Sequence, residues 1–281
     1  MARILVPLIG DKKDGVALTA AHMLASGQGG LIEARLFQRD PLTAMPIVGE
    51  GVSAVNVEKL LDAARHLREE QASSAGATFE AWCTKDAVPH GDMPLEGQVA
   101  ANFTDIEGGI PASIITPARV ADVTIVVTER SNEDASRHEL TQAVLLDALR
   151  PVMLVPTQLP SSIGKRVIVA WNGSAEAARA VSMSYGILKA ADAVTVVSVG
   201  KNADPELLAK TLQLNGIKAS AVSVGDKSSN ATDVLNAEAK KQSADLMIIG
   251  AYSHNRLREF VFGGVTQDLY KNPAIPTLMI H

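Results

Sequence analysis

Residues 166–174 have the sequence RVIVAWNGS, and this stretch decides the fold class. After Arg166 the chain is apolar up to Trp171, which is typical of a strand buried on both faces. Asn172 and Gly173 then supply a turn, and the Ser174 hydroxyl can accept a hydrogen bond from the free amides of a first helical turn. Residues 175–191 carry Ala, Val, Met and Leu at helical spacing. The stretch therefore predicts a strand, turn and helix of an α/β sheet.

The same alternation continues to the end of the chain. We expect further strands at 194–199, 217–224, 246–249 and 277–280, and helices at 205–214, 231–243 and 260–271. The first half repeats this order, with expected strands at 4–9, 31–37, 79–84, 123–127 and 152–155 and helices at 16–26, 57–74, 111–119 and 139–149. Strands that alternate with helices predict a mostly parallel sheet with right-handed crossovers.

The two halves can be aligned, which indicates duplication of a whole domain. Ala121-Asp122 precedes the fourth strand of the first half, as Ala244-Asp245 does in the second. A proline directly precedes the last strand in each half, at Pro151 and Pro276. We therefore predict two tandem five-stranded, mostly parallel open-sheet α/β sandwich domains of Rossmann-like type, at 1–157 and 165–281. The Pro- and Ser-rich segment 156–164 is the expected linker.

Composition and charge exclude several classes of partner. The net charge of −5 gives no basic excess for a nucleic acid backbone. No apolar run is long enough for a membrane span, and the start MARILVPLIG lacks the features of a signal peptide. One cysteine, Cys83, fits a reducing cytoplasm. Of the two interpretations of Cys83, a catalytic thiol and a small filler near the end of a strand, the second is favoured.

The loops that follow the strands are where an open parallel sheet binds ligands. After the fourth strand of the second half, Gly250 is expected to let the chain turn tightly out of the sheet. Gly263-Gly264 then precede an expected helix, whose amides would form an anion site, and Thr266 adds a hydroxyl. From the residues alone, a phosphate site and a simple helix-entry turn are equally supported.

The spacing of this segment resembles the ATP loop of the universal stress protein family, G-x2-G-x9-G-S/T after a strand. The chain offers Gly250-x2-Ser253-x9-Gly263-Gly264, within GAYSHNRLREFVFGGVT. The sequence VAWNGS and the helix that follows it are also similar to tandem bacterial members. The resemblance covers most of 165–281 and, more faintly, 1–157, and it implies an adenine nucleotide α-hydrolase-like fold.

The resemblance also implies a set of binding residues for ATP, with Mg²⁺ arriving on the nucleotide. Asn172 matches the position near the nucleoside, where the family has Asp, and Val199 matches the position against the adenine. The phosphate-facing positions and the adjoining strand ends complete the expected set: Ala170, Ile249, Gly250, Ser253, Gly263, Gly264, Val265 and Thr266. Ser253 and Gly264 depart from the family pattern and predict weaker binding. His254 and Arg256 are left open as phosphate-steering or solvent-facing residues.

The first half departs further from the family pattern. Leu8-Ile9 stand where polar turn residues are expected, and Glu129, Glu133 and Asp134 place negative charge where phosphates would lie. We therefore expect that the first copy does not bind ATP.

Two functions stay open at this point. One is a cytoplasmic stress-response sensor or adaptor that binds ATP in its second domain, and the other is a non-binding interaction scaffold with an unknown protein partner. An enzyme such as a slow ATPase is disfavoured because no general base, catalytic triad or metal pattern is evident. The last strands, 152–155 and 277–280, are expected to pair within the chain as a pseudo-dimer, and a homodimer of chains is a further expectation.

Overall fold

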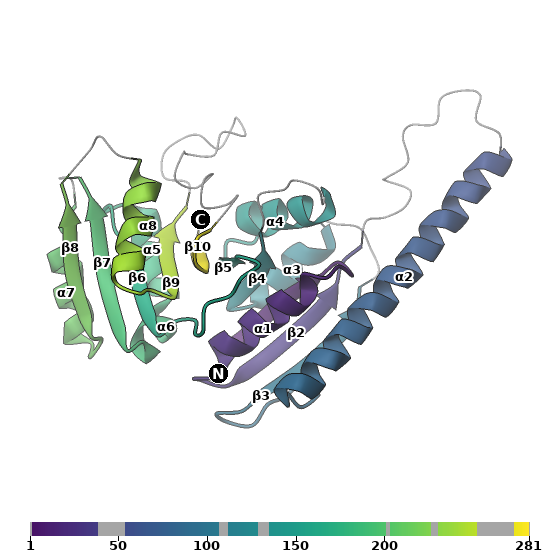
Figure 1. The fold of residues 1–281 in the computed structure, drawn as a ribbon, viewed down its shortest axis with the longest axis horizontal. Coiled ribbons are helices and arrows are strands. Elements are labelled where there is room, and N and C mark those ends of the chain that lie inside the picture. Colours follow the sequence, from purple (N-terminus) through teal and green to yellow (C-terminus); the bar gives the residue numbers. More distant parts are fainter. Residues whose placement is uncertain are drawn as a thin grey trace.

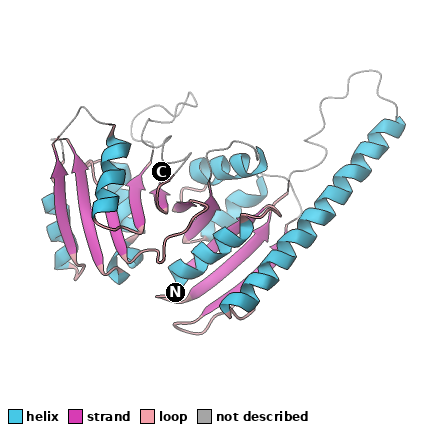
Figure 2. Ribbon diagram, viewed as in Figure 1, coloured by secondary structure: helices cyan, strands magenta, loops and turns pink. Residues whose placement is uncertain are grey.

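The structure is a computed structural model that describes residues 2–38, 54–106, 112–128, 135–200, 203–225, 230–251 and 273–280. Over these residues the chain forms a ten-stranded sheet between two layers of helices (Figures 1 and 2). No helix of this part combines the length and the apolar character that a membrane crossing requires.

Each half contributes five strands to this sheet. The first half contains β1 (Ala2–Leu8), α1 (Asp14–Ala25), β2 (Gly30–Leu36), α2 (Ala54–Asp86), β3 (Val99–Asp105), α3 (Ala112–Val120), β4 (Val123–Val127), α4 (Ala135–Asp147) and β5 (Val152–Val155). The second half contains β6 (Arg166–Ala170), α5 (Ala175–Met183), α6 (Tyr185–Ala190), β7 (Ala193–Val199), α7 (Pro205–Leu214), β8 (Ala219–Val224), α8 (Ala231–Lys241), β9 (Leu246–Gly250) and β10 (Thr277–Ile280).

The strand order is β3-β2-β1-β4-β5-β10-β9-β6-β7-β8. Within each half the pairing is parallel, and the first strand lies between the second and the fourth. The chain order therefore reverses direction between β1 and β4, and again between β6 and β9. We call these two places switch points, because the loops on either side of them diverge and leave room for a ligand.

The halves are joined by one antiparallel pair of strands. Thr277 lies opposite Leu154, and Leu278 lies opposite Met153. The expected pairing of the last two strands within the chain is thus confirmed, and it merges two five-stranded sheets into one. At this junction the carboxyl ends of the two sets of strands point in opposite directions.

Aliphatic side chains that alternate along the strands form a core on each face of the sheet. On one face, Ile4 and Val6 of β1 pack in the same cluster as residues of α1, α2, α5, α6 and α7. On the other face, Leu5 packs in a cluster with residues of α3, α4 and α8. Corresponding helices of the two halves cover the same face of the sheet. The predicted α/β sandwich is therefore confirmed, and each helical layer contains helices from both halves.

The two halves also repeat one polar contact at the amino ends of their strands. The Asp122 carboxylate accepts a hydrogen bond from the backbone N–H of Arg3 at 2.8 Å. The Asp245 carboxylate accepts one from the N–H of Arg166 at 3.0 Å. Asp245 also accepts the N–H of Gly164, which fixes the segment that connects the halves. The repeat seen in the sequence is therefore also a repeat of contacts.

The prediction of a strand at 79–84 is wrong, because these residues lie in the C-terminal part of the 33-residue helix α2. Phe79, Trp82 and Cys83 are spaced by three and four residues, which places them on one helical face, and all three are buried. A short apolar run can fit either a strand or a helix, and here the helix is the correct assignment. The third strand is instead β3, whose pattern of burial is irregular.

The predicted helix at 175–191 is two helices, since α5 ends at Met183 and α6 begins at Tyr185 around Ser184. Two other details of this half are confirmed. Ser174 caps α5, and Pro205 begins α7 after the cap residue Asp204. The helix predicted at 260–271 lies outside the described residues.

Candidate functional site

Four of the predicted binding residues lie together at the carboxyl ends of three neighbouring strands. Ala170 at the end of β6 is paired with Ile249 of β9, and on its other side with Val197 of β7. Val199 ends β7, and Gly250 ends β9. Their strands are buried along most of their length, but these end residues are all partly exposed. The switch point of the second half therefore presents a small, mainly apolar edge to solvent.

Asn172 lies just beyond this edge, in the exposed turn that leads from β6 into α5. Its side-chain oxygen accepts a hydrogen bond from the N–H of Ser174 at 3.0 Å. Gly173 has a φ of +75°, a conformation that suits glycine. The Ser174 hydroxyl accepts the N–H of Ala177 at 3.2 Å and so caps the helix. The cap therefore uses one amide of the first turn of α5, that of Ala177.

Gly250 is required for a different reason from the one predicted. We expected a tight turn out of the sheet, but Gly250 still belongs to β9 and has no positive φ. A Cβ atom at this position would lie 2.4 Å from the backbone nitrogen of Ala177 and 2.5 Å from the carbonyl carbon of Glu176. The glycine therefore allows the first turn of α5 to pack directly on the end of β9.

The remaining predicted binding residues follow Gly250 in the chain. They lie outside the described residues, as do the two side chains that were left open: Ser253, Gly263, Gly264, Val265, Thr266, His254 and Arg256. The phosphate loop thus stays a prediction, whereas the structure brings together Ala170, Asn172, Val199, Ile249 and Gly250.

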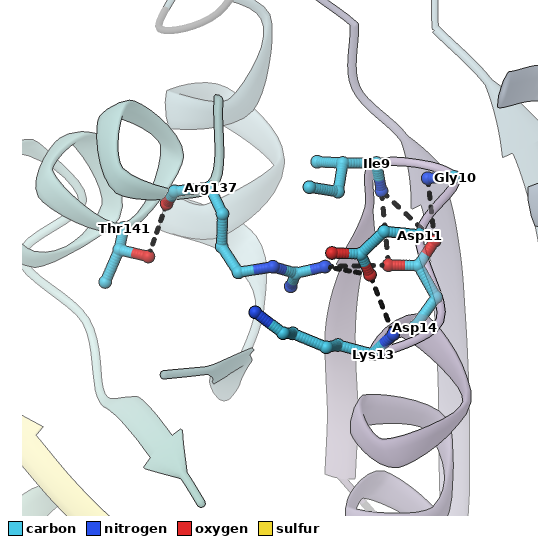
Figure 3. Close-up of polar contacts among 7 residues, drawn as sticks. All are labelled: Ile9, Gly10, Asp11, Lys13, Asp14, Arg137 and Thr141. Atoms are coloured by element: carbon cyan, nitrogen blue, oxygen red, sulfur yellow. Dashed lines mark hydrogen bonds and ion pairs between the residues drawn. The ribbon is translucent and has the colours of Figure 1, made fainter. Parts of the chain in front are cut away.

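The switch point of the first half is built differently (Figure 3). Leu8 and Val127, which end β1 and β4, are fully buried. The carboxylate of Asp14, in the first turn of α1, lies against the loop after β1 and has no exposed surface. It accepts hydrogen bonds from the backbone N–H of Gly10 at 2.8 Å and of Ile9 at 3.2 Å.

Arg137 of α4 completes this cluster from the other side of the switch point. Its Nη2 atom donates to Asp14 at 3.1 Å and to Asp11 at 2.6 Å. Burial raises the pKa of Asp14 to about 6, Arg137 opposes that rise, and the charge of Asp11 adds to it. One sequence feature indicates this cluster, an Asp shortly after a buried strand. No sequence feature indicates Arg137, which is 123 positions from Asp14 along the chain.

Cys83 and clustered titratable side chains are the other candidates for a reactive centre. Burial raises the pKa of the Cys83 thiol to about 11, and Glu80 and Asp86 add to the rise. A thiolate nucleophile is therefore disfavoured there, in agreement with the packing role expected for this residue. Among the described residues, no group of three or more His, Cys, Asp or Glu side chains is arranged to hold a metal ion.

The strand order and the layered helices define a Rossmann-like α/β protein with an open switch point in its second half. The model of the universal stress protein family matches residues 164–281. A universal stress protein of Synechocystis sp. is 28% identical over 138 residues, which cover 46% of this chain and 46% of that protein. The matched part is thus about half the length of this curated relative. The second half of the chain belongs to the universal stress protein family, as its resemblance predicted.

Solved structures extend the likeness to the whole chain. A universal stress protein from Archaeoglobus fulgidus matches with a TM-score of 0.65 and 13% identity, covering 99% of this chain and 97% of that one. A protein of unknown function from Pseudomonas aeruginosa PAO1 matches with a TM-score of 0.52 and 16% identity, over 99% and 92% of the two chains. At such identities the likeness shows the fold alone, and it confirms the predicted fold class for both halves.

Proposed function

We propose that this universal stress protein binds ATP in its second half and acts as a stress-response sensor or adaptor in the cytoplasm. The observation that carries the proposal is the open edge formed by Ala170, Val199 and Ile249. These apolar residues are partly exposed and pack in the core on the face of α8. An adenine ring is flat and apolar on its faces, and such a surface suits it.

The neighbouring polar groups agree with the same ligand. Asn172 is exposed beside this edge and can hydrogen-bond a ribose hydroxyl. The chain continues from Gly250 into the segment that carries Gly263 and Gly264 at the spacing of the family's ATP loop. Backbone amides next to glycines can approach phosphates closely. Mg²⁺ would then arrive with the nucleotide, and no catalytic step is assigned to the chain.

The proposal predicts that purified protein carries nucleotide and that ATP binding can be removed at one residue. Mass spectrometry of the purified chain should detect a bound adenine nucleotide, and titration calorimetry should give heat with Mg-ATP. In Gly263→Asp the added carboxylate repels the phosphates, so we expect at least a tenfold loss of affinity.

Gly27→Asp is the matched control, since a Cβ atom at this exposed position of the first half meets nothing within 4 Å. Its affinity should equal that of the unmodified protein. If the protein contains no nucleotide and gives no heat at saturating ATP, the proposal is wrong and the interaction scaffold becomes the better interpretation. Equal loss in both variants would place the ligand outside the expected loop.

A further inference from the structure

The Asp14 carboxylate in the first half lies in a set of donors that resembles a receptor for a small anion. Two consecutive backbone N–H groups, those of Ile9 and Gly10, point at it from the loop after β1 (Figure 3). The guanidinium of Arg137 donates to it from α4. Adjacent amides together with a guanidinium are a common arrangement for binding carboxylates and phosphates. Here the bound anion is a side chain of the protein itself.

This receptor occupies the place where the second half is open. Asn172, which follows β6, is exposed, whereas Ile9 at the corresponding place after β1 is buried and donates its N–H to Asp14. The strand residues before them show the same contrast, since Pro7 is buried and Ala170 is partly exposed. The position that would receive a ligand in the first half is thus already filled.

The donors do not depend on Asp14 alone for their position. The side chain of Arg137 is only 8% exposed, and its Nη2 atom also donates to Asp11 at 2.6 Å. Asp11 is held in turn by the backbone N–H of Lys13 at 2.8 Å. The Thr141 hydroxyl donates to the backbone carbonyl of Arg137 at 2.6 Å, within α4. Removal of the Asp14 carboxylate would therefore leave the guanidinium in place, facing the two loop amides.

We propose that the switch point of the first half is an anion site that Asp14 closes as a built-in ligand. The contact is autoinhibitory, because it excludes external anions from the half that has lost the ATP-loop pattern. Asp11 already balances part of the charge of Arg137, so the vacated site favours a small monoanionic carboxylate over a phosphate. This inference concerns the first half and does not depend on ATP binding in the second.

The test is to remove the built-in anion and supply one from solution. Thermal unfolding of Asp14→Ala is followed in sodium formate and in sodium chloride at equal ionic strength. A ligand that binds only the folded state raises Tm progressively with its concentration, and for a chain of this size we expect a rise of about 2–4 °C when formate is at about five times its Kd. The unmodified protein and Asp233→Ala, which changes an exposed carboxylate of α8, should respond equally to the two salts.

The variant with both Asp14→Ala and Arg137→Met identifies the receptor. It lacks the guanidinium, so it should lose the specific effect of formate. The inference is overturned if formate acts equally on Asp14→Ala and on the unmodified protein, or if the double variant keeps the effect. Should Asp14→Ala fail to fold in chloride, recovery of folded protein in formate supports the proposal. Failure in both salts shows that Asp14 has a structural role only and also overturns it.

Discussion

The burial of Asp14 has an energetic cost that depends on pH. Its pKa of about 6 in the folded protein lies above the value near 3.9 of an unfolded chain, chiefly because burial disfavours the charged form. The folded state therefore holds this proton more strongly than the unfolded state. The cost is fully present above about pH 6 and is relieved as the pH falls from 6 towards 4. Acidification thus increases the contribution of this residue to stability.

Asp14→Asn should remove that dependence, since an amide of the same shape does not titrate. The difference in the free energy of unfolding between the unmodified protein and the variant should change by about 2 kcal/mol between pH 4 and pH 7, because one pKa unit corresponds to about 1.4 kcal/mol and part of the effect is already present at pH 4. The unmodified protein should be relatively weaker at pH 7. Denaturant unfolding at a series of pH values measures this difference. Parallel curves for the two proteins would show that Asp14 keeps an ordinary pKa, and Asp233→Asn serves as the exposed control.

Among the individual residues of the site, some could be predicted from the sequence and others could not. Asn172 and Gly250 follow buried strands, and their chain positions alone place them at the edge of a parallel sheet. Arg137 could not be found this way, because its contact with Asp14 depends on how α4 packs across the switch point. The need for a glycine at position 250 could not be predicted correctly either, since it depends on how closely α5 approaches β9.

Among the elements, β9 and α5 are in close backbone contact beside the candidate site. The first turn of α5 touches the backbone of Gly250, and the same turn follows the loop that carries Asn172. A shift of α5 would therefore move the exposed turn relative to the end of β9. The packing of one helix on one strand sets the spacing of the proposed nucleoside position.

Gly250→Ala should destabilise the protein by roughly 1–3 kcal/mol, a usual cost of overpacking, because the atoms that its Cβ would meet are backbone atoms that cannot rotate away. Gly186→Ala in α6 is the matched control, since its Cβ would meet only the side-chain oxygen of Gln28, at 3.7 Å. That change should be neutral or stabilise by up to about 1 kcal/mol, because alanine favours helix. Denaturant unfolding compares the two variants, and equal stabilities would contradict the close packing of α5 on β9.

Prediction of the elements succeeded where a segment had one clear period. The bounds of β4, β5, α7 and β10 were predicted as the structure has them, since each is a short buried run or a capped helix. The region of α2 was more difficult. Its last turns carry Phe79, Trp82 and Cys83 in a run that also fits a strand, and only packing against α1 and β3 distinguishes the two.

For the whole molecule, the antiparallel pair β5–β10 is the main connection between the halves. Cleavage of the linker should therefore not separate them. A protease site inserted between Thr157 and Gln158 would give two fragments, which we expect to elute together in size-exclusion chromatography under native conditions. In the cleaved Met279→Pro variant the proline removes an N–H that faces β5, because residue 279 alternates with the β10 residues that bond to β9, and the fragments should separate. The uncleaved variant is the control for folding, and immediate separation of the unsubstituted fragments would contradict this role of the β5–β10 pair.

The antiparallel junction has a consequence for how the two halves could diverge. Since the carboxyl ends of their strands point in opposite directions at β5–β10, the two switch points do not share loops. A substitution beside Asp14 leaves the surroundings of Asn172 unchanged, and the reverse also holds. Natural selection could therefore preserve the shared strands in both copies while the ligand position of one copy became closed. Because of this junction, both copies could conserve the fold while only one copy conserved its binding site.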